Sequence, residues 1–296
     1  MRAHNAAIHC FGMALGAQVQ QWRLPQPIDG DPLPTVDLPL PLKAMLFRRG
    51  LCSAEQVESL LSEQPLPAPD RHFPELETAL KRLKKACLEQ EPVAICGDYD
   101  ADGMTSTALL MRAFEAMGAC PQAAIPSRMD DGYGLNIGMV EQLHSAGVRL
   151  LVTVDNGVAA HEALEKASEL GVEVILTDHH TLPAARPKAL ALIHPATTPD
   201  NSPYDSLAGV GLAYVLARAL AAELNRPESI STARDLFCIG TVADMAPLTG
   251  ANRTLLREGL GHLHRSSCPG VQALQQLAGL GDRPLRADDI GFQLAP

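Results

Sequence analysis

The sequence predicts an α/β fold in which a parallel sheet carries helices on both faces, with a proline-rich extension before it and helices after it. Three observations support this prediction. From residue 92 onward, short apolar runs of strand length alternate with segments of helical apolar spacing. This alternation is typical of right-handed βαβ units, whose parallel strands are buried on both faces. After the triplet GVG at 209–211, the pattern becomes helical throughout.

The N-terminal part is expected to lie outside this sheet. Residues 24–42 hold many prolines, so we expect an extended, poorly packed arm that forms neither a regular helix nor a central strand. Residues 52–62 predict a short helix, with Ser53 at its N-cap and Gln56 completing a capping box. Residues 1–72 are therefore predicted to be a proline-rich extension with a short helix.

The central region, residues 73–247, is predicted to be the main domain. Its first segment, 73–90, has helical spacing, and its basic run KRLKK is typical of a solvated helix face. The predicted strands are 92–96, 122–126, 149–154, 172–177 and 189–193. The predicted helices that alternate with or follow them are 105–118, 139–147, 159–171, 212–224 and 231–246. Residues 248–296 are predicted to continue as helices.

The composition is that of a globular protein, with 46% hydrophobic and 20% charged residues. No apolar run approaches the roughly 20 residues of a transmembrane helix, so no membrane association is expected. The seven cysteines are scattered without a C-x-x-C pair, which indicates reduced thiols rather than a disulfide framework or a zinc site. A net charge of −10 argues against a generally basic nucleic-acid-binding surface, although clustered metal ligands would contribute to that negative count.

Acidic and imidazole side chains follow three of the predicted strands. The strand at 92–96 runs into GDYDADG, the strand at 149–154 into DNG, and the strand at 172–177 into DHH. The carboxyl ends of parallel strands share one edge of a sheet, which is where ligands bind. The residues brought to this edge are Asp98, Asp100, Asp102, Asp155, Asp178, His179 and His180, and Asp244 could join them from a later helical segment.

Each of these motifs alone has a structural explanation. Asp102 could cap the helix that follows it, DNG is a good turn sequence, and DHH could be a capping acid beside two surface histidines. Turns need only one acid each, however, so their joint occurrence favours a metal site. Carboxylates with imidazoles and no thiolate suit Mn²⁺ or Mg²⁺. Five or six ligands would serve two ions roughly 3.5–4 Å apart, with Asp155 as the bridging carboxylate.

These motifs, in this order, resemble the DHH phosphoesterase superfamily. Within it, GDYDADG, SRMDDGYGLN and LAGVGLAY are similar to the RecJ family of single-stranded-DNA-specific 5′–3′ exonucleases, from about Phe73 to the end of the chain. The resemblance implies metal-dependent phosphodiester hydrolysis in DNA repair and recombination, with single-stranded DNA as the partner. It further implies two Mn²⁺ or Mg²⁺ ions, and we expect a cytoplasmic monomer.

The resemblance also implies roles for individual residues. The metal ligands would be Asp100, Asp102, Asp155, His179 and Asp244, with Asp98 as a ligand or as a group that supports one. The catalytic residues would be Asp98, Asp155 and His180, and His180 would contact the phosphate or assist protonation of the leaving group. Arg128 is a candidate phosphate contact, whereas His194, at the end of the last predicted strand, is expected to have a structural polar role.

Two departures from the family pattern matter. Many superfamily members have a histidine four residues before the second acid of the first motif, where this chain has Cys96, and Asp98 could take over that role. The chain also stops at GFQLAP, where the family continues into a second domain that grips substrate, so the resemblance covers the catalytic half only. Long single strands are therefore expected to be degraded poorly. The alternatives are a DHH enzyme acting on short oligonucleotides, cyclic dinucleotides or pyrophosphate, and a metal-binding fragment without turnover.

Overall fold

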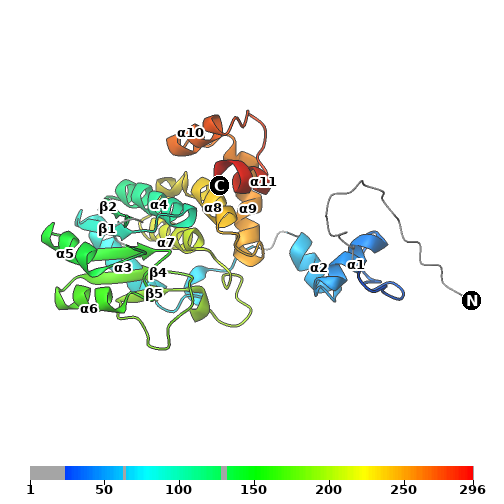
Figure 1. Cartoon of the computed structure of the whole chain (residues 1–296), viewed down its shortest axis with the longest axis horizontal. Coiled ribbons are helices and arrows are strands. Elements are labelled where there is room, and N and C mark those ends of the chain that lie inside the picture. The colour runs from blue at the N-terminus through cyan, green and yellow to red at the C-terminus, as the bar shows by residue number, and fades with distance from the viewer. Residues whose placement is uncertain (1–23, 63–64, 128–131, 296) are drawn as a thin grey trace, which may run out of the picture. The chain divides into compact units, whose positions relative to one another are not determined.

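The computed structural model describes residues 24–62, 65–127 and 132–295. The chain divides into two compact units, Met1–Ser62 and Glu63–Pro296 (Figure 1). The second unit contains the sheet and every residue of the candidate site. The domain limits expected from the sequence, at residues 72/73 and 247/248, stay a prediction.

The first unit contains two helices where the sequence indicated an arm and one helix. Helix α1 spans Leu40–Arg48 and begins inside the segment that was expected to form no regular helix, so that expectation was wrong at its C-terminal end. Pro39 is the N-cap residue of α1 and Pro41 lies in its first turn. Proline is tolerated there because the first backbone N–H groups of a helix have no intrahelical acceptor.

The second helix of this unit forms as the sequence predicts. Helix α2 spans Ala54–Leu61, and Ser53 and Gln56 form the capping box that was expected. The Ser53 Oγ accepts a hydrogen bond from the Gln56 backbone at 3.2 Å, and the Gln56 Oε1 accepts one from the Ser53 backbone at 3.1 Å. Leu33, Leu46 and Val57 form a small buried cluster, so the proline-rich segment is anchored at Leu33.

The second unit is built on a five-stranded parallel sheet, as predicted, with the strand order β2-β1-β3-β4-β5. The strands are β1 (Pro92–Cys96), β2 (Cys120–Ala124), β3 (Leu150–Val154), β4 (Glu173–Thr177) and β5 (Ala191–Ile193). The central strands β1, β3 and β4 consist mainly of apolar and β-branched residues, as expected where both faces of a strand are covered. Strand order changes direction between β1 and β3, and such a switch point opens a ligand site in doubly wound folds.

Helices cover both faces of this sheet, which confirms the predicted fold class (Figure 1). The helices of the second unit are α3 (Leu76–Leu88), α4 (Ala101–Met117), α5 (Ile137–Ser145), α6 (His161–Glu169), α7 (Gly209–Glu223), α8 (Ala233–Ala243), α9 (Gly250–Leu263), α10 (Pro269–Leu277) and α11 (Ala287–Asp289). Helices α5 and α6 pack on the face that includes Ala94, Leu151 and Leu176. The opposite face packs against α3, α4, α7 and the helices that follow. A π-helical turn over Ile290–Leu294 follows α11.

Several element boundaries differ from the sequence prediction, and two of these differences have a local physical reason. Helix α4 begins at Ala101 rather than at residue 105, because the Asp100 carboxylate caps its N-terminus. Strand β2 begins at Cys120 rather than at residue 122. Gly118, in the left-handed conformation, ends α4 and returns the chain directly into the sheet, where Cys120 pairs with Pro92.

A partly exposed ion cluster lies at the amino ends of the strands, opposite the candidate site. Arg82 on α3 donates two hydrogen bonds to Glu91, at 2.8 and 2.6 Å, and it also pairs with Glu173 at the start of β4. The guanidinium holds the pKa of Glu91 below its usual range. The neighbouring lysines of the KRLKK run pair with acidic residues at the surface, in keeping with a solvated helix face.

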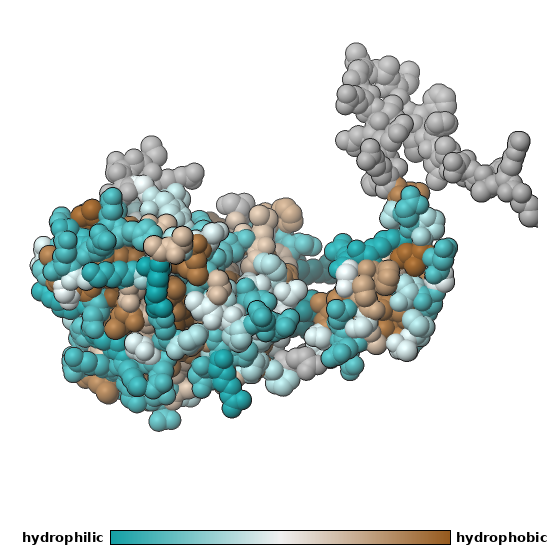
Figure 2. All heavy atoms as spheres, turned by 90° about the horizontal axis from the view of Figure 1, so that it is seen from below, coloured by the Kyte–Doolittle hydropathy of each residue, from teal (hydrophilic) through white to brown (hydrophobic). Residues whose placement is uncertain are grey.

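Polar residues dominate the face of the molecule drawn in Figure 2, and the apolar side chains on it are interspersed among them. Among the described residues, no helix combines the length and the apolar character needed to cross a bilayer. The six cysteines within the described part of the chain are all free thiols. The expected reduced state of those six is therefore compatible with the structure.

Candidate metal centre

The candidate site is built at the carboxyl edge of the sheet. Asp98, Asp155 and Asp178 follow β1, β3 and β4, and each is 1% exposed. Buried carboxylates are rare unless they are paired, hydrogen-bonded or bound to a metal. The packing of three such groups beside adjacent strand ends therefore requires compensating partners.

Asp100 and Asp102 are held by the N-termini of two different helices. The Asp100 Oδ1 accepts a hydrogen bond from the Gly103 backbone at 2.9 Å and so caps α4. Asp102, which the sequence suggested as a possible cap of that same helix, instead reaches α7. Its two carboxylate oxygens accept hydrogen bonds from the backbone N–H groups of Gly209 and Val210, at 2.7 and 2.8 Å. Asp100 and Asp102 thus each bind the N-terminus of a helix and are also candidate metal ligands.

Asp155 has a left-handed backbone, with φ at +61°. Two contacts hold it in that conformation. Its backbone N–H donates to the Thr177 carbonyl at 3.0 Å, and its own carbonyl accepts a hydrogen bond from the Tyr133 hydroxyl at 2.9 Å. Aspartate tolerates this region better than most residues, and strained backbone concentrates at functional sites.

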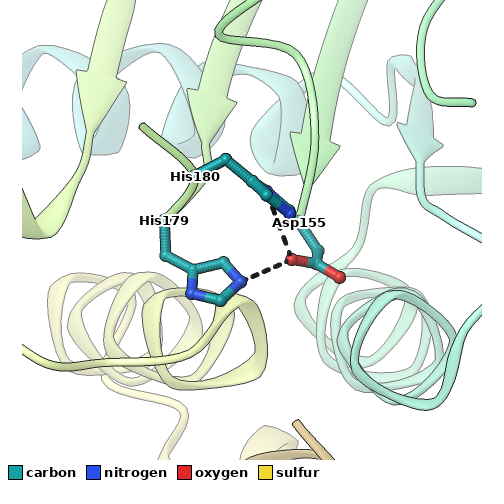
Figure 3. A group of neighbouring side chains, drawn as sticks. All are labelled: Asp155, His179 and His180. Carbon is teal, nitrogen blue, oxygen red and sulfur yellow. Dashed lines mark ion pairs between the residues drawn. The ribbon is translucent and has the colours of Figure 1, made fainter. Parts of the chain in front are cut away.

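His179 lies between two of the buried acids. Its Nε2 is 2.9 Å from Asp155 Oδ1 and 3.9 Å from Asp102 Oδ2. Figure 3 shows the His179 and His180 side chains approaching the same Asp155 carboxylate from beyond the strand ends. Burial alone would lower the pKa of His179, but the Asp155 carboxylate outweighs it, so the pKa of His179 is raised. Without a metal, a proton on this imidazole supplies positive charge among the acids.

His180 is oriented by Asp178 and remains accessible. The Asp178 Oδ1 accepts hydrogen bonds from the His180 backbone at 3.0 Å and pairs with the His180 Nδ1 at 2.8 Å. The other oxygen, Oδ2, accepts a hydrogen bond from the Val158 backbone at 2.9 Å. The His180 side chain is 49% exposed, and its Nε2 lies 3.3 Å from the Tyr133 hydroxyl. The hydrogen bond to Asp178 raises the pKa of His180.

The potential ligand atoms form three overlapping groups. The groups are Asp98–Asp100–Asp155, Asp155–His179–His180 and Asp102–His179–Asp244. All six residues predicted as ligands are included, and Asp155 and His179 each belong to two groups. The structure thus brings these side chains together, and the bridging role of Asp155 stays a prediction that its shared position favours.

The raised pKa values of Asp102, Asp155 and Asp244 indicate that their negative charge needs a cation nearby. Burial is the largest cause that raises the pKa of Asp102, and the nearby Asp155 raises it further. Burial also raises the pKa of Asp155 and of Asp244, and Asp100 adds to both shifts. Carboxylates crowded in this way lose their charge unless positive charge is placed among them. The possible ligand atoms are carboxylate oxygens and imidazole nitrogens, a set that fits divalent cations such as Mn²⁺ or Mg²⁺.

Asn156 is a residue of the site that the sequence indicated only as part of a turn. It is 1% exposed. Its Nδ2 donates to the carbonyls of Cys96 and Val154, at 3.0 and 2.9 Å, and its Oδ1 accepts from the Leu135 backbone at 3.0 Å. One side chain therefore ties the ends of β1 and β3 to the loop that carries Tyr133. The DNG turn signal marks the position, but nothing in it identifies the two distant partners, Cys96 and Leu135.

Three further residues singled out in the sequence lie as follows. The Cys96 side chain is fully buried in the apolar core, and burial raises the pKa of its thiol to about 12, so it is not a thiolate at this site. The His194 Nδ1 accepts from the Ala196 backbone at 2.9 Å, and its Nε2 lies 2.7 Å from the His180 carbonyl, a structural polar role. Arg128, the candidate phosphate contact, lies outside the described residues.

The chain is similar in sequence to known proteins over most of its length. The chain is 37% identical over 278 residues to the single-stranded-DNA-specific exonuclease RecJ of Escherichia coli, an alignment that covers 88% of this chain and 48% of that protein. The chain therefore spans about half the length of that relative.

Solved structures show the same likeness. The structure of RecJ from Thermus thermophilus in complex with Mn²⁺ matches with a TM-score of 0.71 and 34% identity, over 87% of this chain and 36% of that one. The structure of the same protein in complex with Mg²⁺ matches with a TM-score of 0.59 and 32% identity, over 86% and 32% of the two chains. The likeness to RecJ that the motifs indicated is confirmed. The DHH family, N-terminal domain, matches residues 92–241, more than half of the sequence, and the chain belongs to the DHH family.

Proposed function

We propose that this chain forms the catalytic half of a metal-dependent nuclease that hydrolyses single-stranded DNA from its 5′ end. The observation that carries the proposal is the convergence of Asp98, Asp100, Asp102, Asp155, His179 and Asp244 in overlapping groups at one sheet edge. Neither capping nor turn formation requires so many acids at one edge, of which Asp98, Asp102 and Asp155 are buried. The substrate class is supported by the relatives, which are named as single-stranded-DNA-specific exonucleases.

The metal assignment follows from the donor set. Asp98, Asp100 and Asp155 would hold one ion, and Asp102, His179 and Asp244 would contribute to the second, with Asp155 shared. Two divalent cations would polarise a phosphoryl group, lower the pKa of the attacking water and stabilise the departing oxygen. The Mn²⁺ and Mg²⁺ complexes of RecJ support the choice of these ions.

The protein's own contribution centres on His180. Asp178 fixes the His180 Nδ1, which leaves the Nε2 directed toward Tyr133 and the open side of the site. The hydrogen bond to Asp178 raises the pKa of His180 and so favours the protonated imidazole, which would donate a proton to a phosphate oxygen or to the leaving group. Asp155 and Asp98 would orient the reacting groups by fixing the cations, and Arg128 would contact the phosphate.

The direction of cleavage and the biological setting rest on the family resemblance. We propose 5′–3′ degradation, a role in DNA repair and recombination, and action as a cytoplasmic monomer. A nuclease that advances along a strand must hold it between cuts, and a chain with a net charge of −10 offers little general attraction for a polyanion. We therefore expect this chain to cut long strands distributively and short oligonucleotides more readily.

The test is a substrate panel incubated with the purified 296-residue chain and Mn²⁺, with EDTA as the blank. The panel contains single strands labelled at either end, a duplex, a dinucleotide, a cyclic dinucleotide and pyrophosphate. The proposal predicts that single strands are cut and that a 5′ label is released before a 3′ label. Asp155→Asn should abolish release, whereas Asp282→Asn, at an exposed position in the loop before α11, should not.

Each other outcome selects an alternative. Hydrolysis confined to dinucleotides or pyrophosphate would reassign the chain to another DHH activity. Binding of Mn²⁺ without hydrolysis of any substrate would indicate a metal-binding fragment without turnover. Release of the 3′ label first would contradict the proposed direction while leaving the metal centre intact.

A further inference from the structure

The first turn of α7 is capped by an acid from another helix. Its N-cap residue, Ala208, has no side chain that can accept a hydrogen bond, so the first backbone N–H groups lack a local acceptor. Asp102, more than 100 positions earlier in the sequence, accepts from both Gly209 and Val210. The contacts of 2.7 and 2.8 Å are at the short end for N–H donors and are typical of bonds to a charged acceptor.

Gly209 lies against two acids of the candidate metal centre at once. A Cβ at this position would be 2.7 Å from the Asp155 Cβ, 2.9 Å from the Asp102 Oδ2 and 3.0 Å from the Asp155 Cγ. Distances below 3.0 Å force a displacement, and the partners here are the first atoms of a short side chain and a carboxylate that is already hydrogen-bonded. The absence of a side chain at Gly209 therefore permits this approach.

The glycine is not required by its own backbone. Gly209 is not among the residues with a positive φ, so alanine would adopt the same helical conformation without strain. Alanine is also the better helix former. Local structure alone would therefore accept an alanine here, and the steric contact with Asp102 and Asp155 is what opposes it.

The helix cannot easily move away to accommodate a methyl group. Residues Gly209–Ala217 of α7 are all buried, and the helix packs against α3, α4 and β3. Interiors are close-packed, so a rigid-body shift of such a helix would disturb many contacts. The short side chains of Asp102 and Asp155, which can rotate individually, are the parts that would yield.

We propose that Gly209 is a positioning residue of the metal centre: it lets the N-terminus of α7 seat between Asp102 and Asp155 and so sets the spacing and orientation of both carboxylates. This inference rests on the proposed metal-dependent function. Asp102 and Asp155 belong to different ligand groups that are joined through His179. One steric contact thus controls both halves of the centre, and α7 also provides the positive end of its dipole to Asp102.

The test measures Mn²⁺ binding by titration calorimetry in the whole chain, without any substrate. Gly209→Ala should bind Mn²⁺ roughly 10–100-fold more weakly, the range typical of changes to groups that orient metal ligands. Gly211→Ala is the matched control, since it lies in the same helical turn and the three atoms nearest to its Cβ, at 2.8 to 3.4 Å, belong to the side chain of Leu207 and not to an acid. This control should bind with wild-type affinity.

The outcomes separate the inference from the function on which it rests. If the wild-type chain binds no Mn²⁺, the proposed function fails and the inference fails with it. If wild type binds and Gly209→Ala binds equally well, the inference alone is wrong. Equal weakening in Gly211→Ala would also overturn it, because the effect would then come from the helix rather than from the acids.

A second measurement applies if Gly209→Ala does not fold. In the wild-type chain, the amide signals of Gly209 and Val210 can be followed by NMR during titration with diamagnetic Mg²⁺. Because both amides donate to Asp102, a cation that binds Asp102 should shift both signals. Binding of Mg²⁺ without a shift at either amide would contradict the proposal.

Discussion

Replacing Asn156 by aspartate tests how the edge of the sheet is held together. The two side chains have nearly the same shape, but aspartate has no N–H₂ group to donate. In the native structure that group donates to the carbonyls at the ends of β1 and β3, while the side-chain oxygen accepts from the Leu135 backbone. The substitution keeps the acceptor and converts both donor contacts into contacts between oxygens.

The cost can be worked out from these contacts. Each lost hydrogen bond removes about 0.5–1.5 kcal/mol, and a buried carbonyl left without a donor costs about 1–3 kcal/mol, with partial relief if water enters. Asn156 is 1% exposed, so solvent offers little compensation. We expect Asn156→Asp to lower the free energy of unfolding by about 2–4 kcal/mol, a large part of the stability of an ordinary domain.

The assay is urea unfolding in the presence of EDTA, so that metal binding does not contribute. The matched control is Asn136→Asp. Among the described residues, Asn136 uses its side-chain oxygen alone, which accepts from the Met139 backbone at the N-terminus of α5. Aspartate caps helices as well as asparagine does, so the control should be neutral. Equal stability of Asn156→Asp and wild type, or an equal loss in the control, would refute the reasoning.

Three other predictions concern the metal, the two histidines and pH. Mn²⁺ at 100 times its dissociation constant should raise the free energy of unfolding of the wild-type chain by about 2.7 kcal/mol. Calorimetry should show that Asp155→Ala loses most of this stabilisation. Equal stabilisation of wild type and Asp155→Ala would rule out Asp155 as a ligand. His179→Ala should lose Mn²⁺ affinity together with hydrolysis, whereas His180→Ala should lose hydrolysis alone, and equal losses of affinity in Mn²⁺ titrations would remove this division of roles. The pKa of Glu91 is lower in the folded chain than in the unfolded chain, where it is about 4.5. Its ion pair should therefore stabilise the folded chain fully above about pH 4.5. This stabilisation should be lost as the pH falls through the pKa that Glu91 has in the folded chain. Glu91→Gln should therefore flatten the decline in stability measured by urea unfolding between about pH 6 and 3, while Glu77→Gln, at an exposed pair, should follow wild type.

The sheet could be predicted because its strands are recognisable in the sequence. The apolar runs that became β1, β3 and β4 are bounded by turn residues and separated by helical segments, so length and periodicity agreed. The errors arose where a single side chain or a proline decides the boundary. Asp100 extends α4 by a full turn through its cap, and Pro39 starts α1 within a segment whose proline content argued against any helix.

The convergence of the acids and histidines at one edge could be predicted, but their contacts with one another and with the rest of the fold could not. Strand ends of a parallel sheet meet at one edge, so acids that follow successive strands are expected to converge wherever the helices lie. The pairing of Asp102 with α7, and of Asn156 with Leu135, depends on how distant segments pack in three dimensions. Asp178 illustrates the same limit, since the sequence places it at the edge but only the structure shows that it orients His180.

The left-handed backbone at Asp155 limits which residues this position can hold. Glutamate would supply the same charge, but it lacks the short polar side chain that makes this conformation acceptable to aspartate and asparagine. The fold thus discriminates between two acids of equal charge before any ion is bound. It also leaves asparagine as a neutral replacement that fits the same backbone. A single Asp155→Asn substitution could therefore remove the negative charge from the metal centre while the fold stays the same. A chain with this fold need not have a functional metal centre.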